Sequence, residues 1–177
     1  MTETSTSENG TGAQPGNSGN LPEGAEADFQ LEGFFPYRVR VFYSDVTSAL
    51  SAIYQRDYGM MPAEWRTMAI LGATSGGLQA TEIVARSSMD KVVVSRAVKR
   101  MEERGFLTRE TNEADGRSYL LRLSETGRAV YDDLGPKLKA VEAKMLRGLT
   151  DDEITGFLEV AQKIRDNLAS GAEGAED

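Results

Sequence analysis

The amino-acid sequence predicts a mainly α-helical fold that contains one small β-hairpin. From Pro36 to about residue 170, apolar residues recur at steps of three and four, which is the spacing of amphipathic helices. Only residues 106–123 interrupt this pattern, because they read as two short strands around a polar, glycine-containing segment. The predicted order is therefore four helices, a hairpin, a long helix and a last helix. The two shortest neighbouring helices lie directly before the hairpin.

The N-terminal part of the chain separates into a tail and a helix. Residues 1–33 are rich in Gly, Ser, Thr, Asn and Glu and contain no Lys or Arg, which is typical of a disordered tail. Apolar residues then mark an amphipathic helix of about 20 residues that ends at Gly59. We assign this helix to the segment of residues 34–60. Its apolar positions are Val39, Phe42, Val46, Leu50 and Ile53.

Three more helices are predicted before the hairpin. Pro62 suits the first turn of the second helix, which carries Trp65. The third helix extends from about Gln79 to Arg86. The fourth begins near Asp90, whose carboxylate suits a helix N-terminus, and it ends at Gly105.

The hairpin and the following helices also have local signals. Residues 106–109 and 118–123 predict strands that flank the tip at residues 112–116. Ser124 suits the N-cap of a long helix, and the capping-box pattern from Thr150 to Glu153 opens the last helix. Residues 61–123 therefore read as a helix-turn-helix followed by a wing, residues 124–170 as two helices, and residues 171–177 as a flexible tail.

The composition excludes several classes of chemistry. The 177 residues include no cysteine and no histidine, so disulfides, thiolate and imidazole metal ligands, and Cys- or His-based catalysis are absent. There is no Gly-rich phosphate loop and no Gly-x-Ser-x-Gly elbow. We expect no enzyme activity, no metal and no cofactor. Neither a secretory signal nor a run of 18 apolar residues is present, so we expect a cytoplasmic protein without a membrane span.

The charge is unevenly distributed. The chain carries −8, whereas residues 78–123 hold nine basic against seven acidic side chains and so carry +2. The remainder therefore carries −10. A local basic surface on an acidic body is compatible with binding of nucleic acid, although a charge run alone is usually only a solvated face.

The fourth helix supplies the most specific candidate surface. When its apolar face packs inward, a basic and polar face points outward over about two turns, which suits a DNA major groove. We predict that Arg96 reads a base edge, and that Ser95, Lys99 and Arg100 contact phosphates. The predicted DNA-contacting residues of this helix are Lys91, Val92, Ser95, Arg96, Lys99 and Arg100.

The hairpin tip offers a second contact. Arg117 could enter a minor groove, where negative potential is concentrated, while Asp115 braces the guanidinium or the loop. Taken alone, an Asp-Gly-Arg sequence is more often a solvated turn. The preceding helices and their basic outward face favour the DNA interpretation.

The stretch from Met89 to Tyr131 resembles the recognition helix, wing and following helix of the MarR family of bacterial and archaeal regulators. The family's wing motif matches at Asp115, Arg117, Leu123, Ser124 and Gly127, although Gly116 stands where many relatives carry a second basic residue. The resemblance implies a homodimer, in which residues 34–60 and 124–170 form dimerisation helices and residues 61–123 form the DNA-binding lobe. A two-fold dimer requires a pseudo-palindromic double-stranded operator with half-sites about one helical turn apart.

The resemblance also implies a small-molecule effector. Family members commonly bind an aromatic or carboxylate-bearing molecule where the dimerisation helices meet the lobe, and then release DNA. The region around Tyr54 to Trp65 resembles the branch that responds to hydroxycinnamates, so we expect a small aromatic acid or its acyl-CoA thioester. Aromatic walls and arginines suit such a ligand. The candidate residues are Arg38, Arg40, Phe42, Tyr43, Trp65 and Met68, each of which is also compatible with an ordinary core or surface position.

Two other functions remain open from the sequence. A winged-helix domain can serve protein–protein contact, and the acidic total charge slightly favours that reading. A DNA-binding regulator without any small-molecule ligand is equally compatible with the sequence. The predicted function is a sequence-specific transcriptional regulator that acts as a repressor and is released from its operator by the effector.

Overall fold

The computed structural model describes residues 29–111 and 118–173. The chain divides into two units, residues 1–38 and 39–177. In the first unit, Leu31–Gly33 forms one turn of 3-10 helix, η1, and the rings of Phe29 and Phe34 meet edge to face with centroids 5.2 Å apart. The end of the predicted N-terminal tail therefore contains a helical turn. The earlier part of that tail lies outside the described residues.

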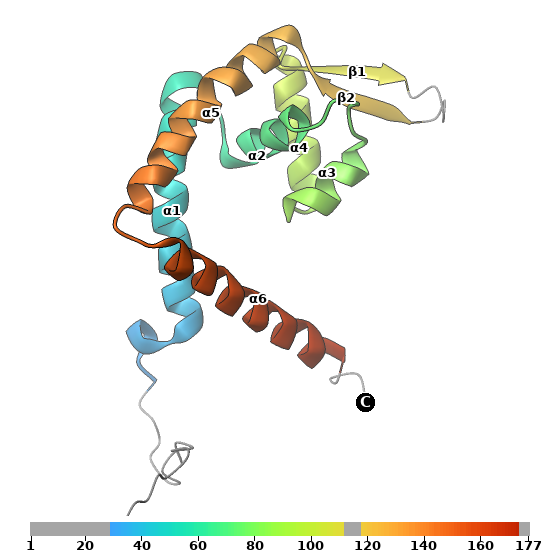
Figure 1. Cartoon of the computed structure of the whole chain (residues 1–177). Helices are drawn as coiled ribbons and strands as arrows, with labels where there is room; N and C mark the ends of the chain where they lie inside the picture. The colour runs from blue at the N-terminus through green and yellow to red at the C-terminus, as the bar shows by residue number, and fades with distance from the viewer. Residues whose placement is uncertain (1–28, 112–117, 174–177) are drawn as a thin grey trace, which may run out of the picture. The chain divides into compact units, whose positions relative to one another are not determined.

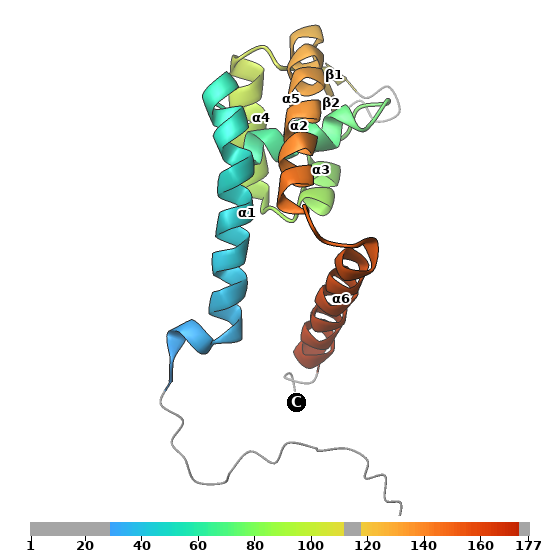
Figure 2. The same ribbon diagram turned by 60° about the vertical axis from the view of Figure 1, so that its left-hand side comes forward.

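The described residues form six α-helices and one antiparallel hairpin, which confirms the predicted fold class (Figures 1 and 2). No helix in residues 29–111 and 118–173 is long and apolar enough to cross a membrane. The elements are α1 (Phe35–Tyr58), α2 (Pro62–Gly72), α3 (Ala80–Ser87), α4 (Lys91–Glu103), β1 (Leu107–Thr111), β2 (Tyr119–Leu123), α5 (Glu125–Met145) and α6 (Asp151–Glu173).

Side-chain caps explain why the helices begin where the sequence predicted. The Asp90 carboxylate accepts a hydrogen bond from the backbone N–H three residues later, at 2.9 Å, and the Ser124 hydroxyl does the same at 2.9 Å. Thr150 and Glu153 form a reciprocal capping box, because the backbone N–H of each donates to the side chain of the other at 2.7 and 3.2 Å. After α4, Gly105 has a φ of +71°, the left-handed conformation that favours glycine.

Helices α2, α3 and α4 pack with the hairpin into a lobe (Figure 1). Its centre is formed by Met68, Ile83, Val94 and Met101, each with at most 1% of its surface exposed. The N-terminal half of α5 completes this core, because Leu134 is fully buried in the same cluster. The lobe is therefore closed by a helix that continues beyond it toward α6.

The hairpin is fixed to the lobe at its base. β1 pairs antiparallel with β2, and Arg109 stands opposite Leu121. Leu78, before α3, forms an isolated bridge with Leu121, with hydrogen bonds of 3.0 and 2.8 Å. The base of the hairpin is thus held to the segment between α2 and α3. Residues 112–117, which include the predicted tip, lie outside the described residues.

α5 continues through Gly135 and Pro136 as a single helix. α6 begins at the Thr150 cap and extends to Glu173, so the predicted C-terminal tail begins later than residue 171. The four residues after Glu173 lie outside the described part.

A polar cluster joins the C-terminal end of α1 to α5. Lys137 Nζ donates to Asp57 Oδ2 at 2.9 Å and to Asp133 Oδ2 at 2.6 Å, and the Tyr58 hydroxyl donates to Asp133 Oδ2 at 2.7 Å. Hydrogen bonds from Arg56 and Lys137 hold the pKa of Asp57 at about 2, and those from Lys137 and Tyr58 lower the pKa of Asp133. The cluster therefore favours both carboxylates in their charged form.

Replacing Asp57 by asparagine is expected to reduce the sensitivity of the fold to acid. A carboxylate with a lowered pKa in the folded state stabilises the fold above its unfolded pKa, and this stabilisation disappears as the pH falls through the folded value. The relevant window is between the usual value of 3.8 and about 2. Urea unfolding at several pH values in this window should give a steeper loss of stability for the wild type than for Asp57→Asn. Equal slopes would show that the cluster does not contribute.

Candidate nucleic-acid interface

The packing of α4 determines which of its side chains face solvent. Val94, Ala97, Val98 and Met101 are buried, and their spacing places one face of α4 against the core of the lobe. The opposite face and its edges carry the residues that the sequence predicted as DNA contacts. All six of them are exposed: Lys91, Val92, Ser95, Arg96, Lys99 and Arg100.

Two cations of α4 have no acidic partner among the described residues. These are Lys91 and Arg96, whereas Lys99 lies 3.8 Å from Glu103 one turn later. Such an exposed pair is weak, because solvent screens both charges. Between the two unpaired cations, Val92 exposes 56% of its surface. The arrangement offers a guanidinium for a base or phosphate and a methyl surface for a thymine.

Arg100 and Arg104 lie at the edge of α4 that is near α2. The carboxylate of Glu64, which is only 3% exposed, lies 3.9 Å from Arg100 and 3.5 Å from Arg104. The same carboxylate accepts a hydrogen bond from the Met61 N–H at 2.8 Å at the start of α2. Arg104 also donates to the backbone carbonyl of Tyr58. Arg104 is therefore a structural residue, and the predicted phosphate contact of Arg100 stays a prediction.

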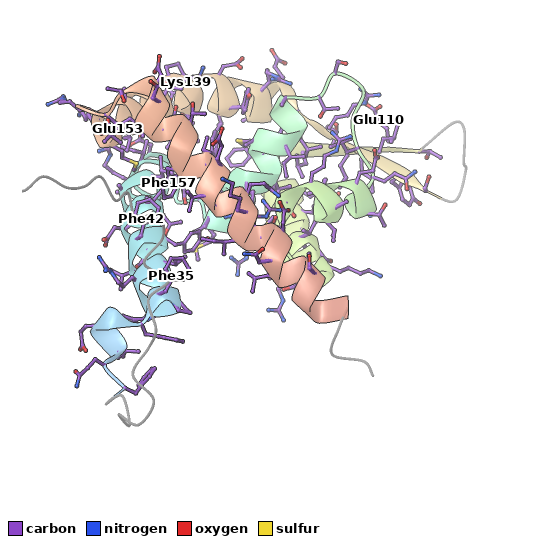
Figure 3. All side chains as sticks on the ribbon, turned by 60° about the horizontal axis from the view of Figure 1, so that its bottom comes forward. Phe35, Phe42, Glu110, Lys139, Glu153 and Phe157 are labelled. Carbon is purple, nitrogen blue, oxygen red and sulfur yellow. The ribbon has the colours of Figure 1, made fainter. Side chains whose placement is uncertain are left out.

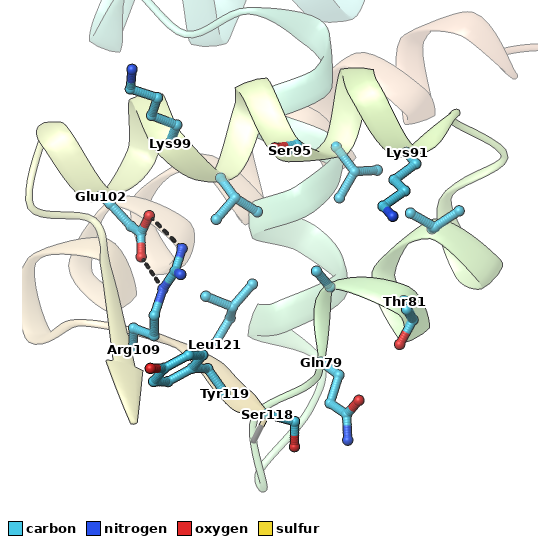
Figure 4. A pocket seen from close by; sticks show the side chains of 14 residues that line it. Gln79, Thr81, Lys91, Ser95, Lys99, Glu102, Arg109, Ser118, Tyr119 and Leu121 are labelled. Carbon is cyan, nitrogen blue, oxygen red and sulfur yellow. Dashed lines mark hydrogen bonds and ion pairs between the residues drawn. The ribbon is translucent and has the colours of Figure 1, made fainter. Parts of the chain in front are cut away.

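A groove of about 690 Å³ lies beside α4, between α3 and the hairpin (Figure 4). Its floor is apolar, from Val94, Val98 and Leu121. Polar and charged groups surround this floor on all three elements. The polar side chains on its rim include Gln79, Thr81, Lys91, Ser95, Lys99, Glu102, Arg109 and Tyr119.

Several basic residues near the groove are engaged within the protein, which a count of charges could not reveal. Arg122 donates to Glu110 Oε2 at 2.8 Å and to the Ser75 carbonyl at 3.1 Å. Arg109 is bound by Glu102. Together with Arg104, these residues hold the hairpin and α4 in place. The predicted wing contacts Asp115 and Arg117 lie outside the described residues and stay predictions.

A second cavity, of about 860 Å³, lies between α1, α2, α5 and α6. Of the predicted effector contacts, Phe42 and Trp65 line it. Arg40 and Tyr43 are exposed residues outside its lining, and Arg38 belongs to the first unit. Met68 is fully buried in the core of the lobe and is not among the residues that line the cavity.

The cavity also has walls that sequence reasoning did not identify. The Trp65 ring stacks near the rings of Tyr54 and Tyr131, with centroids 6.1 and 6.2 Å apart. Phe157 of α6 meets Phe42 of α1 edge to face at 5.7 Å (Figure 3). Lys139 is the cation among the lining residues. The recurrence of apolar residues at steps of three and four predicted helices here, but it gave no local signal for which side chains line a cavity.

The described residues contain no cluster of acidic side chains able to hold a metal ion. Burial raises the pKa of the Tyr54 hydroxyl above its usual value. Two candidate binding sites are therefore present. One is the basic helix α4 with the groove beside it, and the other is the aromatic cavity.

Comparison with known proteins agrees with this geometry. The MarR family profile matches residues 58–118, which cover α2, α3, α4 and β1. A MarR family regulator from Silicibacter pomeroyi, whose crystal structure is known, is 30% identical; the similarity covers 78% of this chain and 92% of that chain, with a TM-score of 0.63. CouR from Rhodococcus jostii RHA1, whose crystal structure was determined with bound p-coumaroyl-CoA, is 21% identical in sequence. The similarity covers 81% of this chain and 94% of that chain, with a TM-score of 0.63.

Curated relatives are also transcriptional regulators. The repressor MdtR of Bacillus subtilis is 27% identical over 131 residues, which cover 68% of this chain and 84% of MdtR. The uncharacterised regulator YwaE of the same organism is 26% identical, and there the similarity covers 52% of this chain and about half, 54%, of YwaE. The fold, with its exposed helix α4 and its hairpin, and the related proteins lead to the same conclusion. The chain belongs to the MarR family of winged-helix, DNA-binding transcriptional regulators.

Proposed function

We propose that this regulator is a homodimeric repressor that a small aromatic acid, or its coenzyme A thioester, releases from a pseudo-palindromic operator. The observation that carries the effector part is the aromatic cavity of about 860 Å³, because its lining includes residues of α2, a helix of the DNA-binding lobe. A ligand that occupies the cavity touches the lobe and the outer helices at once. Occupancy can therefore bias the position of α4 through α2.

Unburied apolar surface supports a second copy of the chain as the partner. Phe157, Leu158 and Val160 of α6 expose 55–61% of their surface, and Leu168 exposes 71%. Phe157, Leu158 and Val160 are near neighbours on one helix, and apolar side chains that are exposed together in this way are typical of an interaction surface. In a two-fold dimer, α6 buries this surface, and two copies of α4 reach successive major grooves of one DNA face.

The chemistry of the cavity supports an aromatic acid as the effector. Trp65, Tyr131, Phe42 and Phe157 provide flat apolar walls, and Lys139 provides a positive charge at the lining. Aromatic walls with one or two cations suit a planar ring that bears a carboxylate. CouR, which resembles this chain in fold, was crystallised with p-coumaroyl-CoA, and a thioester of that kind is one of the two ligand classes proposed.

Trp65 makes the proposal directly testable, because it is the only tryptophan of the chain. Hydroxycinnamates, benzoates and their coenzyme A thioesters are titrated into the protein while tryptophan fluorescence is recorded. In parallel, release is measured from a duplex that the wild type selected out of randomised DNA. We expect one ligand class to change the fluorescence and to release the DNA over the same concentration range.

Other outcomes of this experiment would select among the alternatives. Specific DNA binding that no compound relieves would reject the aromatic effector and leave a ligand-independent regulator. Failure to select any sequence, even at low salt, would favour a winged-helix module for protein–protein contact.

Arg38 and Arg40 are not among the residues that line the cavity, so their predicted role of holding the carboxylate or phosphate of the effector stays a prediction that mutation can test. Guanidinium groups bind such anions bidentately, so we expect the double variant Arg38→Ala/Arg40→Ala to lose ligand-induced release and to keep its DNA affinity. The comparison variant is Lys139→Ala, which removes the cation that lines the cavity. Loss of ligand response in the lysine variant alone would transfer the anion-binding role to Lys139.

A further inference from the structure

Glu102 of α4 and Arg109 of β1 form a bidentate ion pair at the edge of the groove. Arg109 Nε donates to Glu102 Oε1 at 2.8 Å, and Nη2 donates to Oε2 at 3.0 Å (Figure 4). This fork-to-fork geometry fixes direction as well as distance. This ion pair links α4, the candidate DNA-binding helix, to the base of the hairpin.

The hairpin pleat explains why Arg109 reaches α4. Arg109 stands opposite Leu121, which is buried, so both side chains lie on the face of the hairpin that looks toward the core and α4. On the same face, the guanidinium lies over the Tyr119 ring, 5.5 Å from its centroid. Arg109 is therefore held by a carboxylate and an aromatic ring together.

Other contacts attach the two strands of the hairpin at different places. Arg122 and the bridge between Leu78 and Leu121 connect β2 to the segment before α3. At the start of β1, the Phe106 N–H donates to the Met101 carbonyl of α4 at 2.8 Å. The Glu102–Arg109 pair adds a side-chain link farther along β1, and this link limits how far the strand can tilt from the last turn of α4.

The pair is not suited to other roles. Its side chains are 27% and 47% exposed, and ion pairs with that exposure add little to stability. Two donors of Arg109 are already satisfied by Glu102, so the residue is a poor choice for an additional phosphate contact. The carboxylate of Glu102 belongs to the candidate DNA-binding helix itself, so it repels phosphates. A role in positioning compensates for that repulsion.

We propose that Glu102 and Arg109 are positioning residues for DNA binding. They hold the base of the hairpin at a fixed distance and angle from α4, so that the helix and the hairpin enter neighbouring grooves in one register. The role concerns DNA recognition by this family member and is independent of the effector.

The substitution Glu102→Gln tests this role by the sign of its effect. On charge alone, removal of a carboxylate near DNA strengthens binding; loss of positioning weakens it. We expect Glu102→Gln to bind the duplex selected by the wild type roughly tenfold more weakly, with a Tm close to that of the wild type. The matched control is Glu103→Gln, because Glu103 is the next residue of α4 and has only the exposed contact with Lys99 at 3.8 Å. That control should bind equally well or more tightly.

A double-mutant cycle completes the test. If the two residues act as one unit, Arg109→Gln and Glu102→Gln/Arg109→Gln should weaken binding about as much as Glu102→Gln alone. In these variants, the slope of the logarithm of DNA affinity against the logarithm of salt concentration should also become shallower by about one unit. That change is expected when a basic group of the hairpin no longer contacts the DNA. Arg109→Lys, which keeps the charge and loses the fork, should recover only part of the affinity. Binding by Glu102→Gln that equals or exceeds that of Glu103→Gln would overturn the proposal.

Discussion

Replacing Gly127 by alanine is expected to destabilise the protein by about 3 kcal/mol and to lower its Tm by roughly 10 °C. A Cβ atom at this position would lie 2.0 Å from the carbonyl oxygen of Phe106 and 2.9 Å from its carbonyl carbon. That carbonyl accepts a hydrogen bond from the Ser124 N–H at 3.0 Å, so it cannot move aside without loss of the bond. Thermal unfolding at a fixed protein concentration measures the effect.

Gly156 provides the control for this substitution. It also lies inside a helix, and a Cβ atom there would meet no heavy atom within 4 Å. Gly156→Ala should therefore leave Tm unchanged or raise it slightly, because alanine favours the helix by up to about 1 kcal/mol. If both alanine variants melted alike, the close approach of α5 to Phe106, in the segment between α4 and β1, would not determine stability.

Replacing Arg96 by alanine is expected to lower affinity for the selected duplex by roughly 10- to 100-fold, and affinity for an unrelated duplex by much less. Arg96 is exposed on the outward face of α4 and has no acidic partner among the described residues, so its guanidinium is available for a base edge. Fluorescence anisotropy with both duplexes at one salt concentration gives the ratio of affinities. Loss of that ratio is the signature of base recognition.

Lys99→Ala is the matched comparison for the arginine variant. An ammonium that contacts phosphate contributes to both duplexes, so both affinities should fall by a similar factor, with a salt slope about one unit shallower. If Arg96→Ala kept the sequence preference of the wild type, the rotational position assigned to α4 would be wrong.

The sequence predicted the elements well because their ends are determined by local chemistry. Asp90, Ser124 and Thr150 each start a helix through a hydrogen bond that spans only three residues, and Gly105 ends one through its own backbone conformation. The burial of Val94 and Met101 likewise follows from helical periodicity alone. Local rules of this kind need no knowledge of the tertiary fold.

The function of individual charged and apolar residues was less predictable, because it depends on partners far away in the sequence. Arg122 binds a carbonyl 47 residues away. Met68 and Trp65 are three residues apart on α2, yet one is fully buried in the core of the lobe and the other lines the cavity. Helix periodicity marks both as inward-facing, and only the packing of α1 and α5 separates them.

The passage of α5 through Gly135 and Pro136 has a mechanical consequence. Proline has no N–H to donate, so the backbone of α5 lacks one hydrogen bond in this turn, and Gly135 contributes no side chain to stiffen it. Gly135 also forms part of the cavity wall. This turn of α5 therefore lies at the wall of the cavity, so the cavity can widen or narrow by bending of one helix while the hydrogen bonds on either side stay intact.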